Sequence, residues 1–162
     1  MRVTFTKERH RYGVYVQRDK APDLWMRGPG YSDDLPHDLL HFVAEAEYGL
    51  DGGIFGDLAA GGHAKLFMPV DRTLIPKLWR AKRMHKYVLL EGRRSEELAD
   101  ALARGWHDRS LPTPLLAKLD ALAREWRTLQ VGRSMTLEWP SGRPTRPRSS
   151  AARRRRVSRR RA

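Results

Sequence analysis

Residues 2–17, RVTFTKERHRYGVYVQ, decide the fold class, because apolar and polar side chains alternate on both sides of a short basic break. A period of two is typical of strands with one buried face. The break, RHR, separates the two halves and predicts a hairpin with strands over residues 2–8 and 12–18. The apolar side chains expected on its buried face are Val3, Phe5, Tyr12, Val14 and Val16.

Two more strands and five helices are predicted outside this hairpin. LWMRG, residues 24–28, reads as a third short strand, and RSMTLEWP, residues 133–140, as a closing strand that returns to pair with the hairpin. Strands first, helices in the middle and a strand last indicate an α+β domain with an antiparallel sheet and helices packed on one face. Helices are expected over residues 32–49, 52–62, 73–91, 95–109 and 113–130.

Local start and stop signals set the helix boundaries. Asp33 or Asp34 can cap the first helix, Pro36 suits its first turn, and Gly49 can end it. Ser95, together with Glu97–Leu98, reads as a capping box that starts the fourth helix.

Charge divides the chain into two parts. From Arg143 onward there are ten arginines and no acids, whereas residues 1–142 hold 22 basic and 19 acidic residues. We therefore expect a single α+β domain over residues 1–140 and a disordered Arg-rich tail over residues 141–162, because such a tail lacks the apolar surface that folding requires.

The absence of cysteine and of long apolar runs narrows the chemistry and the compartment. With no cysteine in the chain, disulfides, thiolate metal sites and a cysteine nucleophile are excluded, and a metal would need His, Asp or Glu ligands. No apolar run approaches the roughly 20 residues of a membrane span, and the N-terminal stretch lacks the apolar block of a signal peptide. A cytoplasmic protein is the expectation.

LPHDLLHFVAEAEYG, residues 35–49, carries the sharpest hint of chemistry. His37 and His41 stand four positions apart, so on a helix they share one edge with Glu45. Two imidazoles at this spacing can bind one Zn²⁺ or another divalent metal such as Fe²⁺, with a third ligand from elsewhere. The positive end of the helix dipole also favours a neutral His37, the form that binds metal. The candidate third ligands are Asp57 and His63, at either end of the next short helix.

The HDLLH sequence followed by GD at residues 56–57 resembles the zinc motif H-D-x-x-H-x₁₁-E of the coenzyme Q biosynthesis family. The resemblance implies zinc bound by His37, Asp38 and His41, with Asp57 in the place of the family's glutamate. The gap is 15 residues here rather than 11, and the acid is Asp rather than Glu. The motif also resembles the H-E-x-x-H helix of zinc peptidases, with Asp38 in the place of their catalytic base. As a whole, the chain resembles small uncharacterised bacterial proteins of high-GC genomes.

A second function is indicated by the basic segments. The third expected helix carries a cationic face at Lys77, Arg80 and Arg83, and arginine clusters bind phosphate backbones without reading sequence. RNA, DNA or another polyanion is the expected partner. The tail residues that would make the contact are Arg153, Arg154, Arg155, Arg156, Arg159, Arg160 and Arg161.

Other familiar sites are missing from the sequence: there is no phosphate-binding loop, no G-x-G-x-x-G and no G-x-S-x-G. Three functions stay open. The first is a small metal-binding protein in which Asp38 orients a ligand or, in an enzyme, acts as a base. The second is a non-enzymatic polyanion-binding protein, and the third is a structural or interaction protein.

Overall fold

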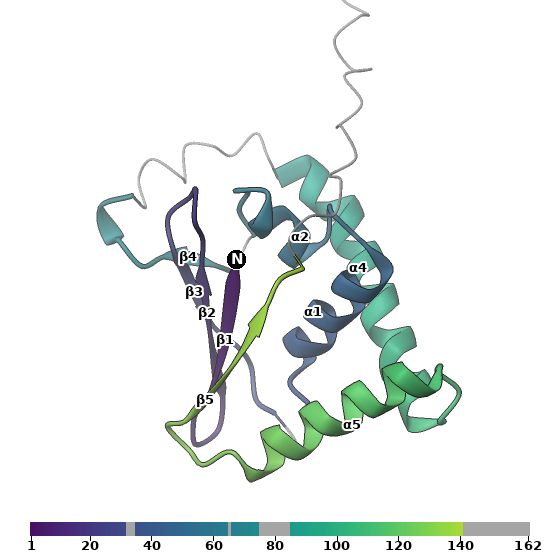
Figure 1. Ribbon diagram of the computed structural model, residues 1–162. Coiled ribbons are helices and arrows are strands. Elements are labelled where there is room, and N and C mark those ends of the chain that lie inside the picture. The colour runs from purple at the N-terminus through teal and green to yellow at the C-terminus, as the bar shows by residue number, and fades with distance from the viewer. Residues whose placement is uncertain (32–34, 65, 75–84, 141–162) are drawn as a thin grey trace, which may run out of the picture.

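The computed structural model describes residues 1–31, 35–64, 66–74 and 85–140, and for 85–91 only the backbone. Its centre is a five-stranded antiparallel sheet with strand order β4-β3-β2-β1-β5. The helices gather on one side of this sheet (Figure 1). The predicted α+β class and the antiparallel sheet are therefore confirmed. The strands are β1 Arg2–Lys7, β2 Tyr12–Gln17, β3 Leu24–Arg27, β4 Met68–Pro69 and β5 Ser134–Glu138.

The hairpin and the closing strand lie where the alternation predicts. In β1 and β2, Val3 pairs with Val16 and Phe5 with Val14, and all four side chains point into the core. β5 returns along the other edge of β1, with Met135 opposite Phe5. Strand β4 was not predicted, because a strand of two residues is too short to show an alternating pattern.

Four α-helices complete the described fold, with a short 3₁₀ helix at Arg72–Leu74. α1 lies between the sheet and α4, and α5 crosses beside them before the chain returns to the sheet (Figure 1). The helices are α1 His37–Tyr48, α2 Ile54–Ala59, α4 His85–His107 and α5 Thr113–Thr128.

The predicted boundary at Ser95 is wrong. α4 runs without interruption from His85 to His107, so Ser95 lies inside a helix and does not start one. Its hydroxyl bonds to two side chains of α1 instead of capping a backbone amide. The expected helix over residues 73–91 falls partly outside the described residues, and its last part belongs to α4.

The ends of α1 follow the predicted signals in part. Gly49 ends the helix in the left-handed region, at φ 66°, and donates its N–H to the carbonyl of Glu45. The helix begins at His37, directly after Pro36, which makes no side-chain cap. Asp33 and Asp34 lie outside the described residues.

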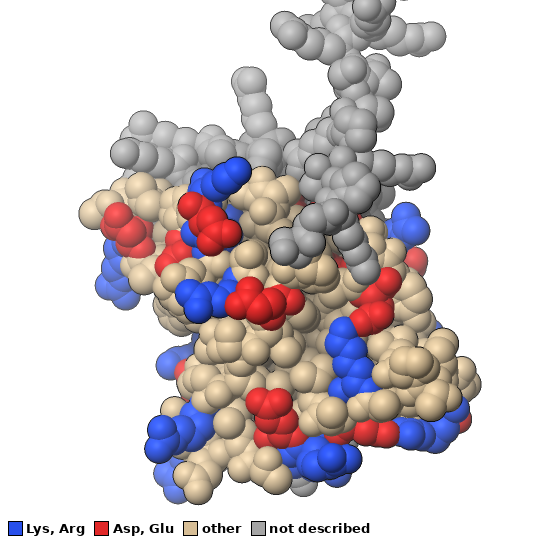
Figure 2. Space-filling model, viewed as in Figure 1, with Lys and Arg blue, Asp and Glu red and all other residues tan. Residues whose placement is uncertain are grey.

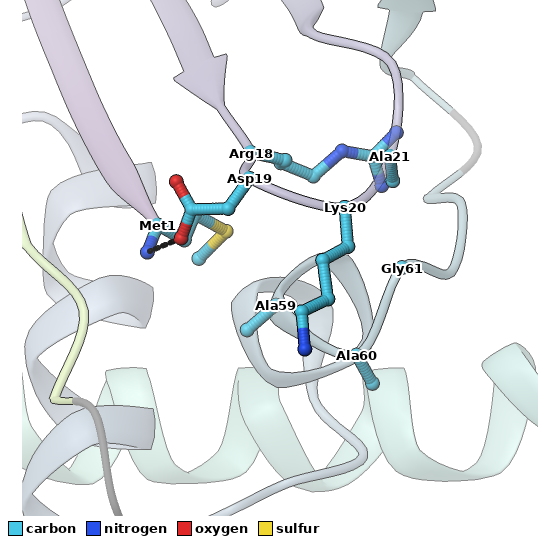
Figure 3. Close-up of a pocket in the computed structure, with 8 residues that line it drawn as sticks. All are labelled: Met1, Arg18, Asp19, Lys20, Ala21, Ala59, Ala60 and Gly61. Atoms are coloured by element: carbon cyan, nitrogen blue, oxygen red, sulfur yellow. Dashed lines mark ion pairs between the residues drawn. The ribbon is translucent and has the colours of Figure 1, made fainter.

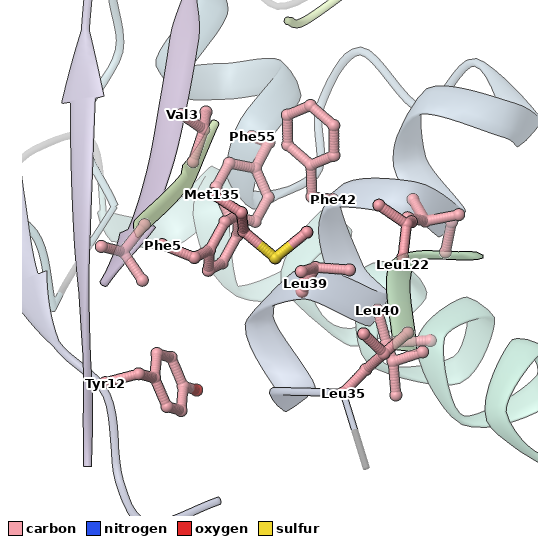
Figure 4. Close-up of a cluster of buried hydrophobic side chains, with 14 of the residues drawn as sticks. Val3, Phe5, Tyr12, Leu35, Leu39, Leu40, Phe42, Phe55, Leu122 and Met135 are labelled. Atoms are coloured by element: carbon pink, nitrogen blue, oxygen red, sulfur yellow. The ribbon is translucent and has the colours of Figure 1, made fainter. Parts of the chain in front are cut away.

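The core forms where α1 faces the sheet. Phe5 and Met135 from the sheet point toward Leu39 and Phe42 of α1, and Phe55 from α2 joins them (Figure 4). The apolar residues of α1, Leu39, Leu40, Val43 and Ala46, are all buried. α5 adds the buried residues Leu119, Leu122, Ala123 and Trp126.

No helix in the described part of the chain combines the length and the apolar character needed to cross a membrane.

Candidate metal centre

The histidine pair occupies the first two turns of α1. His37 is the first residue of the helix, and His41 follows one turn later, with ring centroids 4.6 Å apart and ring planes at 87°. The His37 side chain is 48% exposed, whereas that of His41 is 1% exposed. One imidazole therefore lies at the surface and the other in the interior.

A third donor comes from α4, which packs along α1. Oε2 of Glu96 lies 3.1 Å from Nε2 of His37 and 3.2 Å from Nε2 of His41. Among the residues that the structure describes, these three form the group that can hold a metal ion, with donor atoms within 4.8 Å of one another. The Glu96 side chain is 57% exposed, so the group opens to solvent on one side.

The electrostatics favour the protonation states that bind metal. Burial lowers the pKa of His41, so its ring stays neutral near pH 7. Burial acts to raise the pKa of Glu96, but the hydrogen bond with His37 and the charge interactions with His41 and His37 outweigh this and lower it. The group thus offers a neutral buried imidazole and an ionised carboxylate.

Two further polar side chains lie behind His41. Its Nδ1 is 2.7 Å from the hydroxyl oxygen of Ser95, which is itself fully buried. That hydroxyl donates to Oε1 of Glu45, one helical turn beyond His41 on α1. The edge of α1 that carries His37, His41 and Glu45 therefore faces α4, as their spacing predicts.

Glu45 connects this chain of contacts to the start of α2. Its Oε1 accepts the backbone N–H of Ile54 at 2.7 Å, and its Oε2 accepts those of Phe55 and Gly56 at 2.8 and 3.0 Å. Burial raises the pKa of Glu45, while the hydrogen bonds from Ser95 and the three amides act against that rise. The side chain is 0% exposed, so these donors replace its water.

Asp38, predicted to orient a ligand or act as a base, is held by the sheet. The Tyr12 hydroxyl, which points from β2 toward α1 (Figure 4), donates to Oδ2 of Asp38. Burial raises the pKa of Asp38, and the bond from Tyr12 and the charges of His41 and His37 oppose this. Burial and the neighbouring Asp38 carboxylate both raise the pKa of Tyr12. Asp38 is therefore close enough to influence the histidines, but it does not belong to the group with Glu96.

Asp57 and His63, the predicted third ligands, form a separate contact. Asp57 is buried on α2, and its Oδ2 accepts the backbone N–H of His63 at 3.1 Å. A Cβ atom on Gly62 would lie 2.3 Å from that same oxygen, so the carboxylate packs directly on the loop that follows α2. Glu96 takes the place beside the histidines that the sequence suggested for these residues.

Glu96 and Ser95 were missed because the sequence around them reads as a helix start. No local signal connects residues 95–96 to residues 37–41, which lie more than 50 positions away. The connection exists only through the packing of α4 on α1.

The polyanion hypothesis depends on basic residues that the structure does not describe. Lys77, Arg80 and Arg83, and the whole tail over residues 141–162, fall outside the described residues. On the face shown in Figure 2, basic and acidic side chains of the described part are interspersed. Several are paired, such as Arg109 with Asp120 at 2.8 Å.

A shallow pocket lies between the turn after β2 and the end of α2 (Figure 3). The Arg18 guanidinium in its wall donates to the backbone carbonyls of Pro22 and Gly62, and Asp19 lies 4.0 Å from the N-terminal amine. The pocket shares no residue with the histidine group, and these contacts give Arg18 and Asp19 a structural role.

Comparison with protein-family models, curated proteins and solved structures finds no match to this chain.

Proposed function

We propose that the protein binds a divalent transition-metal ion, zinc or a similar one, through His37, His41 and Glu96. The observation that carries this proposal is the convergence of both Nε2 atoms on a single carboxylate oxygen, at 3.1 and 3.2 Å. Around a tetrahedral zinc with bonds of ~2.0–2.1 Å, neighbouring ligand atoms lie roughly 3.3 Å apart. The distances from the two imidazole nitrogens to the carboxylate oxygen therefore suit one ion bound by all three residues.

The donor set also indicates the class of metal. Two imidazole nitrogens and one carboxylate suit zinc, iron, cobalt or nickel better than magnesium or calcium, which prefer all-oxygen sites. Three protein donors leave a coordination position to water on the exposed side, an arrangement that catalytic zinc sites share. In a catalytic site of this kind, Asp38 would be the nearby side chain that could act as a base.

Zinc titration of tag-free protein, monitored by competition with a chromophoric chelator, tests the proposal. We expect one equivalent of zinc in the wild type and a loss of affinity of at least about 100-fold in His37→Ala, His41→Ala and Glu96→Gln, since even outer-shell substitutions cost about 10–100-fold. Excess magnesium or calcium should not compete.

Matched control substitutions are available on α4, the helix that carries Glu96. Glu97→Gln removes the neighbouring exposed acid and His107→Ala an exposed histidine, and both variants should bind zinc as the wild type does. Asp57→Asn and His63→Ala test the two alternative third ligands that the sequence suggested. Zinc binding that survives Glu96→Gln and His37→Ala unchanged would refute the site.

We infer a second, independent function from the sequence: contact with RNA, DNA or another polyanion through the tail. The ten arginines beyond residue 142 without a single acid support it, because counterion release at phosphates needs such a cluster. Truncation before Arg143 should abolish salt-sensitive retention on immobilised RNA and leave zinc binding intact. Equal retention of the full and truncated chains would contradict this function.

A further inference from the structure

We propose that Glu45 and Ser95 form a positioning relay that holds His41 with its proton on Nδ1, so that Nε2 presents a lone pair to the metal. The inference rests on the proposed metal site and names two residues, outside the group of three donors, that prepare one of them. It is supported by the hydrogen-bond donors and acceptors at Glu45, Ser95 and His41.

The Glu45 carboxylate is surrounded by hydrogen-bond donors. Three backbone amides, those of Ile54, Phe55 and Gly56, point at its two oxygens. An amide N–H can only donate, so both oxygens must accept. With the Ser95 hydroxyl, four donors surround these two oxygens and favour the ionised carboxylate, which has no hydrogen to offer to Ser95.

Ser95 has a single hydroxyl hydrogen. That hydrogen is directed to Oε1 of Glu45. The Ser95 oxygen is left as an acceptor, 2.7 Å from Nδ1 of His41. Nδ1 must then carry a proton to complete the contact.

The other ring nitrogen of His41, Nε2, faces Glu96. A neutral imidazole carries one proton, so protonation of Nδ1 leaves Nε2 with a lone pair. This lone pair lies 3.2 Å from Oε2 of Glu96, which also presents lone pairs. Two facing acceptors repel unless a cation lies between them, and a metal ion bound by both atoms would remove that repulsion. Metal-bound histidines commonly hold their other nitrogen in such a hydrogen bond.

Glu45→Gln tests the direction of the relay. The glutamine carbonyl can still accept from Phe55 and Gly56, but its NH₂ group replaces Oε1, so the bond from Ile54 is lost and the NH₂ group must donate to Ser95. Ser95 then turns its hydrogen toward Nδ1 of His41, and the histidine proton moves to Nε2. We expect zinc affinity to fall by about 10–100-fold, the range for loss of an outer-shell partner.

Long-range ¹H–¹⁵N NMR of the metal-free protein gives a readout that a purely structural role would not move. The wild type should show His41 protonated on Nδ1, and Glu45→Gln should show it protonated on Nε2. Ser95→Ala, which leaves the three amide bonds to Glu45 in place, should also weaken zinc binding, and Ser95→Thr, which keeps a hydroxyl, should restore it. Leu119→Ala, a substitution in the core on α5, lowers stability without touching the relay and should keep wild-type zinc affinity.

The outcomes separate the two proposals. An Nε2-protonated His41 in the metal-free wild type overturns the relay, whether or not zinc binds. Wild-type zinc affinity in both Glu45→Gln and Ser95→Ala overturns it as well. A wild type that binds no zinc overturns the proposed function instead, while the NMR result still decides which tautomer the relay imposes.

Discussion

Replacing Gly53 by alanine tests how closely the Glu45 carboxylate packs against the start of α2. A Cβ atom at this position would lie 2.3 Å from the carboxyl carbon of Glu45 and 2.5 Å from both of its oxygens. The Gly53 backbone is extended, with φ −72° and ψ −167°, so alanine causes no strain of its own there. The whole effect must therefore come from displacing Glu45.

The size of the effect follows from the bonds that Glu45 would lose. An ordinary contact needs at least 3.4 Å, so the carboxylate must retreat by about 1 Å, and amide bonds of 2.7 to 3.0 Å would then no longer form. Loss of a helix cap costs about 0.5–2 kcal/mol, and a buried unpaired donor adds about 1–3 kcal/mol. We expect a loss of about 3 kcal/mol in the free energy of unfolding, or roughly 6–12 °C in Tm for a chain of this size.

Thermal and urea unfolding measure the change, and a double-mutant cycle identifies its cause. Gly53→Ala should be costly in the wild type and nearly neutral beside Glu45→Ala, because the clash then has no partner. Gly92→Ala is the matched control: a Cβ on Gly92, inside α4, meets no atom within 4 Å, and the substitution should stabilise by about 0.5–1 kcal/mol. An undiminished cost of Gly53→Ala in the Glu45→Ala background would refute the reasoning.

Two further predictions concern acids bound by side-chain donors. Hydrogen bonds from Arg109 and Trp106 lower the pKa of Asp120 to about 2, so its contribution to stability is full above pH ~4 and is lost as the pH falls toward 2. Asp120→Asn should flatten this part of the Tm profile measured between pH 5 and pH 2; an unchanged profile would contradict the pairing. Tyr12→Phe removes the donor to the half-buried Asp38 carboxyl and should cost about 1–3 kcal/mol in urea unfolding. Wild-type stability of Tyr12→Phe would mean that Asp38 takes no stabilisation from the sheet.

The sheet and the histidine pair of the candidate metal centre were predictable because their signals are local. Val3 and Phe5 share a face through the period of two, and His37 and His41 share one through the helical period. Gly49 ends α1 because only a residue tolerant of positive φ fits there. Each of these rules needs only a few neighbouring residues.

The rest of the centre depends on tertiary packing. Ser95 followed by acids satisfies the local rule for a helix start, yet the helix runs through it and the hydroxyl bonds to Glu45 and His41 across the interface with α1. Glu96 is an ordinary exposed acid in the sequence, and only the packing of α4 along α1 brings it to the histidines. Asp57 is nearer in the chain, but it packs against the loop at its own helix end.

The donors of the candidate centre are divided between two helices, with His37 and His41 on α1 and Glu96 on α4. A bound ion would therefore act as a cross-link between these helices and tie the folding equilibrium to metal supply. At a free ion concentration 100 times the Kd, the added stability is about 2.7 kcal/mol. The same chain would then be more resistant to unfolding and proteolysis in metal-replete cells than in starved ones, which would make its lifetime a reporter of available metal.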